Sequence, residues 1–156
     1  MFTIRKATVK DIDKILFFIK SLAEYEKMSD QVVADEKLLK EWIFDKGIAN
    51  VLFAVQDDVE VGFALYFNNF STFLGRGGIY LEDLFVLPEF RSKGYGKALM
   101  KRLARIAVES GCGRFEWCCL DWNKPSIDFY HSIGAVKMNG WTTFRLSGQT
   151  LNDFAK

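Results

Sequence analysis

Apolar residues recur at helical spacing in two stretches of the N-terminal third of the chain. The first stretch follows a short strand-like segment at 2–6 and opens with Thr8 and Asp11, which resemble a capping box with Asp in place of the usual Glu. Its apolar positions repeat at helical intervals as far as Ala23, which predicts a helix of about four to five turns. The second stretch runs from about 35 to 44 and predicts a shorter helix that stops before a glycine.

The middle of the chain alternates between strand-like runs and one long helical pattern. Two apolar runs flank a tight polar turn, as in a β-hairpin, and a glycine-rich stretch follows them. In order, the predicted elements are a strand at 51–55, a strand at 61–67, a loop at 68–78, a strand at 80–86, a helix at about 94–110 and a strand at 114–120.

The last part of the chain predicts a short helix and a hairpin. Pro125 fits the first turn of a helix, because proline lacks only an N–H group that is unpaired there and its φ is preset. Gly134 fits the left-handed position just past the helix end. Residues 135–147 suggest two short strands around an Asn-Gly turn. The element order β-α-α-β-β-β-α-β-α-β-β predicts the α/β class, with a mixed central sheet flanked by helices, in a single domain over 1–156.

Composition narrows the function classes. The 156 residues are 49% hydrophobic and 26% charged, which is typical of a soluble globular protein and argues against disorder. The chain shows no membrane-length apolar run and no signal-peptide pattern, so we expect no membrane association and a cytoplasmic location. The 21 basic and 20 acidic residues leave a formal charge of +1, which does not suggest a nucleic-acid surface. The odd set of Cys112, Cys118 and Cys119 lacks a Cys-x-x-Cys pair, so we expect neither a disulfide framework nor a metal site. We interpret Cys118 and Cys119 as small core residues rather than nucleophiles.

Candidate chemistry concentrates at 80–96. An apolar strand carries Glu82 and Asp83, and a proline, a basic glycine-rich turn and a helix pattern follow. A turn that leads into a helix N-terminus favours anions, because its amides lack partners and the helix dipole is positive there. Strand alternation places the two carboxylates on opposite faces unless a bulge intervenes. Burying them costs free energy, so they indicate a polar cleft that attracts a cationic amine; a solvated edge strand or buried ion pairs are the alternatives.

The turn at 91–97 fits neither of two common phosphate-binding fingerprints. Leu99 breaks the dinucleotide pattern Gly-x-Gly-x-x-Gly. Arg91 and Ala98 stand where the phosphate loop requires Gly and Ser or Thr. What remains is Arg-x-x-Gly-x-Gly at the start of a long helix, for which a plain glycine turn is the structural alternative.

Several stretches together resemble the GNAT N-acetyltransferase superfamily, and within it the spermidine/spermine and thialysine acetyltransferases. They are the Arg-x-x-Gly-x-Gly turn, the strand Tyr80-Leu81-Glu82-Asp83-Leu84-Phe85-Val86, the segment Asp121-Trp122-Asn123-Lys124-Pro125-Ser126-Ile127-Asp128-Phe129-Tyr130, and the first-helix residues 22–26. The resemblance covers essentially the whole chain. It implies the GNAT acyl-CoA N-acyltransferase fold, acetyl-CoA as co-substrate, a homodimer, and a bulge in strand 80–86 that admits the pantetheine arm.

The resemblance also implies residue roles. Glu82 is the expected base, acting through water, and Tyr130 is the expected acid. The implied cofactor contacts are Leu84, Phe85, Val86, Arg91, Ser92, Lys93, Gly94, Tyr95, Gly96, Lys97, Asn123, Lys124, Pro125, Ser126 and Tyr130. The implied substrate contacts are Tyr25, Glu26, Glu82, Asp83, Glu116, Trp117 and Cys118. His131, the only histidine, is interpreted as a surface residue.

The implied chemistry agrees with the residue types. Only about one alkylamine in a few thousand is neutral at pH 7, so the enzyme must remove a proton before the amine attacks the thioester. Proton transfer from a phenol to the departing thiolate is uphill by roughly 2 kcal/mol. The expected acceptor is a polyamine, a diamine or a thialysine-like amine. A short turn at 56–60 and a loose match after Leu146 leave open a protein lysine or another amine as acceptor, or a coenzyme A-binding regulatory module without turnover, against which Glu82 and Tyr130 argue.

Overall fold

The computed structural model describes all residues from 1 to 156 and contains one five-stranded sheet in the order β1-β2-β3-β4-β5. Its strands are β1 (Phe2–Lys6), β2 (Asn50–Gln56), β3 (Val59–Ser71), β4 (Arg76–Val86) and β5 (Phe115–Trp117). Neighbouring strands are antiparallel except β4 and β5, which are parallel and joined through helix α3 (Tyr95–Glu109). The predicted mixed sheet of the α/β class is thereby confirmed. The chain divides into two compact units, Met1–Cys118 and Cys119–Lys156, and each is described by itself.

The first helical segment of the first unit begins with the predicted capping box. Thr8 N–H donates to the Asp11 carboxylate at 2.8 Å, across a 3-10 turn at Val9–Asp11 that leads into α1 (Ile12–Tyr25). A further 3-10 turn, Ser29–Gln31, follows α1. The second predicted helix is split, since α2 covers only Glu36–Leu39 and continues as a wider π-helical turn over Lys40–Asp45.

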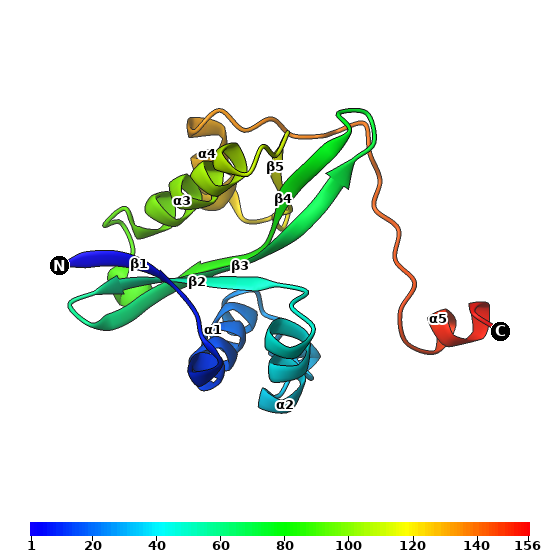
Figure 1. Ribbon diagram of the computed structural model, residues 1–156, viewed down its shortest axis with the longest axis horizontal. Helices are drawn as coiled ribbons and strands as arrows, with labels where there is room; N and C mark the ends of the chain where they lie inside the picture. The colour runs from blue at the N-terminus through cyan, green and yellow to red at the C-terminus, as the bar shows by residue number, and fades with distance from the viewer. The chain divides into compact units, whose positions relative to one another are not determined.

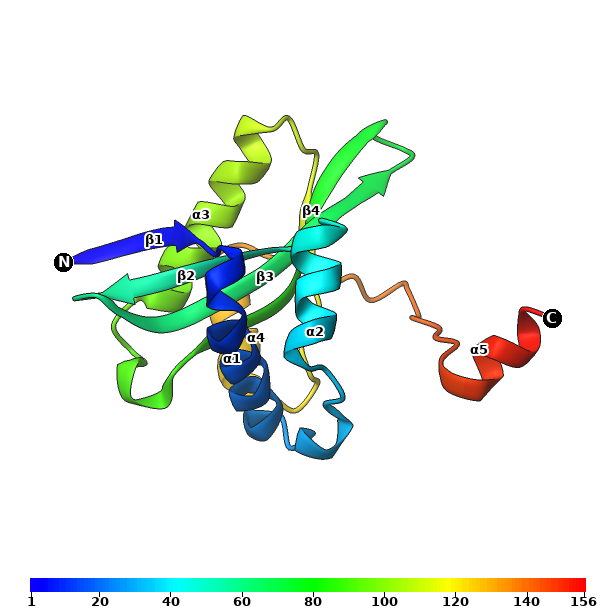
Figure 2. The same ribbon diagram turned by 60° about the horizontal axis from the view of Figure 1, so that its bottom comes forward.

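Helices cover both faces of the sheet in this unit. Figure 1 shows α1 and α2 on one face and α3 on the opposite face, and Figure 2 shows α1 beside α2. On the α1 face the core is rich in phenylalanine and includes Phe18, Phe53, Phe63 and Phe85. On the opposite face, α3 buries Leu99, Met100, Leu103 and Ala107. The apolar positions that predicted these helices are therefore the positions that pack on the sheet.

The predicted loop at 68–78 is wrong. Strands β3 and β4 continue as a paired arm in which Asn69 faces Gly78 and Ser71 faces Arg76, so only residues 72–75 form the turn. Gly78 in this stretch allows neighbouring backbone segments to approach closely and does not form part of a loop. A Cβ atom on Gly78 would lie 2.4 Å from Asn69 Oδ1 and 3.1 Å from Arg114 O, which would push neighbouring strands apart.

The second unit contains two short helices and no strand. Helix α4 (Lys124–Ser132) starts where Asn123 Oδ1 accepts from Ser126 N–H at 3.4 Å, and Gly134 takes the predicted left-handed φ of +90°. Residues 135–147 form no hairpin, and α5 (Gly148–Phe154) follows. That hairpin prediction is wrong; an isolated two-stranded hairpin is marginally stable at best. The strand predicted at 114–120 is likewise reduced to the three residues of β5.

Two general findings concern the whole chain. No helix combines the length and the hydropathy that a bilayer crossing requires. No group of three or more His, Cys, Asp or Glu side chains is arranged to hold a metal ion. The assignment of a single domain to 1–156 remains a prediction.

Candidate active site

The turn between β4 and α3 presents a row of backbone amides without acceptors. After a 3-10 turn at Pro88–Phe90, the backbone takes left-handed φ values at Ser92 (+64°) and Gly94 (+86°). The first hydrogen bond at the start of α3 runs from Ala98 N–H to Gly94 O at 3.0 Å. The amides of Ser92–Lys97 donate to no backbone carbonyl. Because these donors lie at the positive end of a helix dipole, the turn fits a diphosphate group.

One edge of β4 has no neighbouring strand beyond Leu81. β5 pairs with only three residues of β4, and Leu81 is the last of them. Leu87 N–H donates to β3 at 2.9 Å, and antiparallel alternation then directs the backbone groups of Leu84 and Val86 to the free edge. Phe85, predicted to share that role, turns its backbone groups toward β3. The free edge fits an extended chain that contains amide groups, such as pantetheine.

A β-bulge lies at Glu82. In the register of β3 and β4, Tyr66 pairs with Leu81 and Leu65 pairs with Asp83, so Glu82 is the extra residue of β4. A bulge of this kind breaks the alternation of side chains along a strand. The bulge implied for this strand is thereby confirmed.

The bulge brings both carboxylates to one face of the sheet. Tyr80 lies against Phe67, with ring centroids 5.2 Å apart, and Phe85 belongs to the core beneath α1. Alternation from Tyr80 puts Glu82 on this α1 face, and alternation from Phe85 puts Asp83 on the same face. Simple alternation predicted opposite faces for the two carboxylates, and that prediction is wrong because it does not count the extra residue.

Asp83, Glu82 and Glu26 form an acidic cluster without a cation. None of the three takes part in an ion pair or a side-chain hydrogen bond of the protein, and Glu82 is exposed whereas Asp83 and Glu26 are half-buried. Burial and the negative charges of Glu82 and Glu26 raise the pKa of Asp83 to about 7. Burial also raises the pKa of Glu26, which caps the C-terminal end of α1. A concentration of uncompensated negative charge attracts a cationic group.

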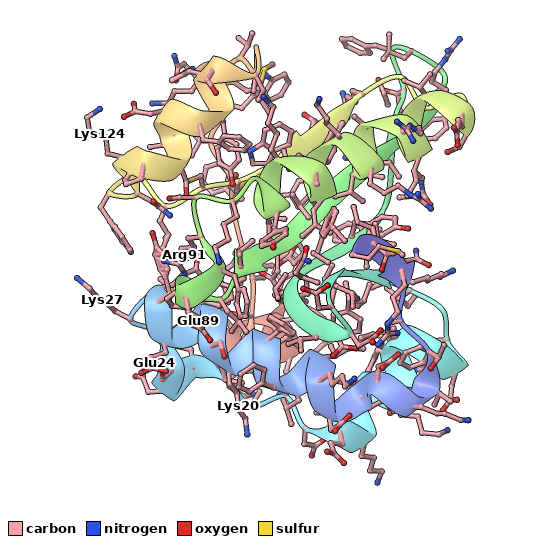
Figure 3. The ribbon with its side chains drawn as sticks, turned by 90° about the vertical axis from the view of Figure 1, so that its left-hand side faces the viewer. Lys20, Glu24, Lys27, Glu89, Arg91 and Lys124 are labelled. Carbon is pink, nitrogen blue, oxygen red and sulfur yellow. The ribbon has the colours of Figure 1, made fainter.

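Arg91 joins the amide turn to the wall of the acidic cluster. Its Nε donates to Val86 O at 2.9 Å, and its guanidinium lies 4.7 Å from the centre of the Tyr25 ring and 5.0 Å from that of Phe85. Figure 3 shows Arg91 next to the C-terminal end of α1. Tyr95 also anchors the turn, since its hydroxyl bonds to Gln56 Oε1 at 3.2 Å. Sequence reasoning missed these contacts, because nothing in the motif shows which way the side chains turn.

The residues predicted on β5 divide between the two faces. Glu116 shares the α1 face with its strand partner Tyr80, and it forms an ion pair with Arg114 at 2.7 Å. The Tyr80 hydroxyl donates to Cys118 Sγ at 3.0 Å. Burial is the largest cause that raises the pKa of Tyr80, and this hydrogen bond raises it further. Trp117 lies on the opposite face, where it packs against the Phe115 ring at 4.9 Å. Of the substrate contacts predicted at 116–118, Glu116 on β5 therefore shares the face of the acidic cluster, and Cys118, just past the end of β5, contacts Tyr80 of that face.

The expectations for the environments of Cys118 and His131 have different outcomes. Cys118 is exposed, so its interpretation as a small core residue is wrong. His131 is exposed on α4, as its surface interpretation requires.

The second unit holds the remaining predicted residues on one short helix. Asn123 caps α4, Pro125 lies in its first turn, and Lys124 pairs with Asp128 at 2.7 Å on the exposed surface. Tyr130 is half-buried in the following turn, with its ring centre 5.6 Å from that of Phe129. Residues 121–134 therefore have the local structure that the sequence predicts, a short helix with Pro125 in its first turn.

Comparisons with known proteins identify the family. The model of the acetyltransferase (GNAT) family matches residues 15–135. The chain belongs to the GNAT acetyltransferase family. It is 39% identical over 164 aligned residues to the thialysine N-epsilon-acetyltransferase of Sus scrofa, covering 97% of this chain and 96% of the relative. It is 33% identical to the human spermidine/spermine N(1)-acetyltransferase-like protein 1, covering 99% of this chain and 24% of that protein.

A solved structure agrees with this assignment. The integron cassette protein VCH_CASS6 from the mobile metagenome of V. cholerae superposes with a TM-score of 0.83 at 32% identity, covering 99% of this chain and 98% of that one. The GNAT fold and the assignment as an N-acetyltransferase are thus confirmed. GNAT enzymes use acetyl-CoA as co-substrate, and the free amides of Ser92–Lys97 and the open edge of β4 fit its diphosphate and its pantetheine arm.

Proposed function

We propose that this N-acetyltransferase moves an acetyl group from acetyl-CoA to a primary amine of a small cationic acceptor, either a polyamine or diamine or a thialysine-like amino acid. The observation that carries the proposal is the acidic cluster, which has no paired cation and takes two of its three carboxylates from β4, the strand that ends at the amide turn. A cationic amine held there lies beside a strand edge that suits the acyl-carrying arm. The relatives named for thialysine and for spermidine/spermine support this acceptor class.

Two residues of the chain are proposed to move protons. Glu82 accepts the proton of the bound ammonium group through a water molecule, which frees the lone pair for direct attack on the thioester. Tyr130 donates its hydroxyl proton to the sulfur of the departing coenzyme A. With ordinary pKa values of about 10 for the phenol and about 8.5 for the thiol, that transfer costs roughly 2 kcal/mol, which formation of a stable amide offsets.

The remaining predicted residues are proposed to bind the two substrates. Acetyl-CoA supplies the acetyl group as a thioester. The backbone of Leu84 and Val86 and the turn Arg91–Lys97 are proposed to hold acetyl-CoA, together with residues 123–126 of α4. Tyr25, Glu26 and Asp83 are proposed to hold the amine.

A thiol-release assay with purified protein, acetyl-CoA and a panel of amines tests the proposal. The panel should contain spermidine, putrescine, thialysine, ornithine, lysine and a lysine-containing peptide. We expect small cationic amines to raise thiol release well above the hydrolysis rate. Selective acetylation of the peptide would favour a protein-lysine acetyltransferase. Binding of acetyl-CoA without any amine-dependent release would favour a regulatory module.

The Tyr130→Phe substitution tests the proposed acid. We expect turnover to fall by about a hundredfold, since general acid catalysis contributes about 10²–10⁴ in rate, while the affinity for acetyl-CoA stays nearly constant. Phe129→Tyr is a matched control, because it changes a neighbouring ring without removing the hydroxyl. Unchanged turnover in Tyr130→Phe would remove this residue from the mechanism.

We also propose that the protein is a cytoplasmic homodimer, and the dimer rests on the resemblance to the spermidine/spermine and thialysine acetyltransferases. Sedimentation of the purified protein tests the dimer, and a monomeric mass across the micromolar range would refute it.

A further inference from the structure

Adjacent carboxylates of β4 differ in what surrounds them, and the difference concerns the fate of the acceptor's proton. Glu82 is the extra residue of the bulge and is exposed, whereas Asp83 pairs with half-buried Leu65 of β3. Both side chains lie on the α1 face. A carboxylate in contact with water can exchange a proton rapidly, and a neighbouring less hydrated carboxylate is the better place to keep it.

The charged groups that face Asp83 come from three elements, and the two that raise its pKa are negative. From the end of α1 it faces Glu26, and from its own strand it faces Glu82. From the turn after β4, Arg91 lies over the rings of Tyr25 and Phe85 and donates to Val86 O, so its charge is directed there and it forms no ion pair with Asp83. Two negative neighbours and no paired cation favour the protonated form of Asp83.

We propose that the proton removed from the acceptor amine comes to rest on Asp83, with Glu82 as the exposed carboxylate that first receives it. This inference rests on the proposed function. It assigns Asp83 a part in proton transfer in addition to its negative charge. It also makes the ionised form of Asp83 the state that is ready for catalysis.

The acceptor nitrogen loses two protons in the reaction, and this step removes the first; the second leaves as the tetrahedral intermediate collapses to the amide and restores the hydroxyl of Tyr130, which has given its proton to the thiolate. The N–H bond of the ammonium group breaks and its electron pair stays on nitrogen as the lone pair that attacks the thioester. The proton passes through water to the Glu82 carboxylate and then to an oxygen of Asp83, which becomes a neutral carboxylic acid. Asp83 returns the proton to water after the products leave. Once the amine has lost its proton it is no longer cationic, so burial and the negative charges of Glu82 and Glu26 favour the proton on Asp83.

The pH profile of kcat/KM for the amine tests the proposal, since this parameter reports ionisations of the free enzyme. For the wild type we expect an ascending limb with a midpoint near 7, the pKa of Asp83. Glu26→Gln and Glu82→Gln each remove one negative neighbour, so each should move that midpoint to lower pH. Asp83→Asn should abolish the limb and lower kcat/KM at pH 8 at least tenfold, and Asp83→Glu should restore it.

Controls separate this role from a structural one. Asp30→Asn changes an exposed carboxylate of the first unit and should leave both the limb and the rate unchanged. Circular dichroism and the affinity for acetyl-CoA should stay constant in all variants. If Asp83→Asn keeps the wild-type limb, or if Glu26→Gln does not move the midpoint, the proposal is wrong.

A second measurement needs no acceptor, so it distinguishes a failure of this inference from a failure of the proposed function. Carboxyl-detected NMR of the free protein should show Asp83 titrating near neutral pH, and at lower pH in Glu26→Gln. Titration of Asp83 near its ordinary value of about 3.9 would overturn the inference even if amines are acetylated. If no amine is acetylated but Asp83 titrates near 7 and responds to Glu26, the acceptor class is wrong and the charge coupling stands.

Discussion

Two groups of carboxylates on the first unit differ in whether cations accompany them. Near the N-terminus, Arg5 binds both oxygens of Asp11 at 2.8 Å and also contacts Glu60 at 2.7 Å, and Lys14 contacts Glu60 at 2.8 Å. The acidic cluster of Glu26, Glu82 and Asp83 has no such partner. Both groups lie beside the same sheet, so the fold does not by itself dictate either arrangement.

The cations reverse the effect of burial on the carboxyl groups. Hydrogen bonds from Arg5 hold the pKa of Asp11 well below its ordinary value, although burial opposes this. Burial and like charge raise the pKa of Asp83 to about 7. A paired carboxylate stabilises the fold as a charged group, whereas an unpaired one costs stability and keeps a proton available near neutral pH. The ion pairs of the first group therefore stabilise the fold, whereas the second group has the properties that the proposed proton transfer requires.

Arg5→Gln should break the ion pairs of the first group and destabilise the fold. Removing one partner of a buried ion pair costs about 3–5 kcal/mol, and we expect about 2 kcal/mol here because the Arg5 side chain is 35% exposed. That corresponds to a fall in the thermal midpoint of about 4–8 °C at neutral pH. Thermal unfolding followed by circular dichroism measures it, and the turnover number of the folded protein should remain that of the wild type.

Matched conditions and variants define this effect. Arg5→Lys keeps the charge but loses the paired contact to Asp11, so it should cost less than Arg5→Gln. Because the pKa of Asp11 is lowered in the folded state, its contribution is complete above the unfolded value of about 3.9 and is lost as the pH falls below that value. The difference between wild type and Arg5→Gln should therefore shrink below about pH 3. A constant difference down to pH 2 would contradict the assignment.

Leu65→Lys should give the acidic cluster a cationic partner, as Arg5 does for Asp11. Leu65 is the strand partner of Asp83 on the α1 face, so a lysine there can approach its carboxylate. The new cation should lower the pKa of Asp83 and repel the cationic acceptor, which should raise the KM for the amine at least tenfold, or about 1.4 kcal/mol. Steady-state kinetics with the acceptor varied measures this, and the KM for acetyl-CoA should change little.

Leu65→Met is the control for loss of packing. It keeps an apolar side chain of similar volume at a half-buried position and should cost less than about 1.5 kcal/mol of stability. If Leu65→Met and Leu65→Lys raise the KM for the amine equally, packing rather than charge determines the result. An unchanged KM in Leu65→Lys would show that the acceptor does not bind beside Asp83.

The sequence predicted what local rules determine. The capping box at Thr8, the glycine that opens α3 and the proline that starts α4 act through their own backbone and appear as predicted. It did not predict features that depend on a distant strand. The arm of β3 and β4 exists because residues such as Asn69 and Gly78 pair across the sheet, and the Asn-Gly turn signal at 139–140 produced no strands in residues 135–147.

The candidate site shows the same division. The residue types at 80–97 were sufficient to indicate an anion-binding turn beside two carboxylates. The resemblance implied a bulge, but the register that places both carboxylates on one face depends on Leu65 and Tyr66 of another strand. The stacking of Arg91 over Tyr25 depends on a contact between residues far apart in the sequence. Three-dimensional neighbours, rather than composition, decide which carboxylate changes its pKa.

Asp83→Asn should change the stability of the fold with the opposite sign to Arg5→Gln. A carboxyl group whose folded pKa of about 7 exceeds its unfolded value costs stability as the pH rises from about 4 through 7. An amide has no such cost, and the difference between a folded pKa of about 7 and an unfolded value of about 3.9 corresponds to about 4 kcal/mol, so between pH 4 and pH 8 the variant should gain up to about that much stability relative to the wild type. Chemical denaturation at the two pH values measures the difference, with Asp30→Asn as an exposed control. Gained stability together with lost activity would show that the enzyme keeps this unpaired carboxylate at the expense of its fold, whereas a destabilised Asp83→Asn at pH 8 would place Asp83 with Asp11 among the carboxylates that hold the fold together.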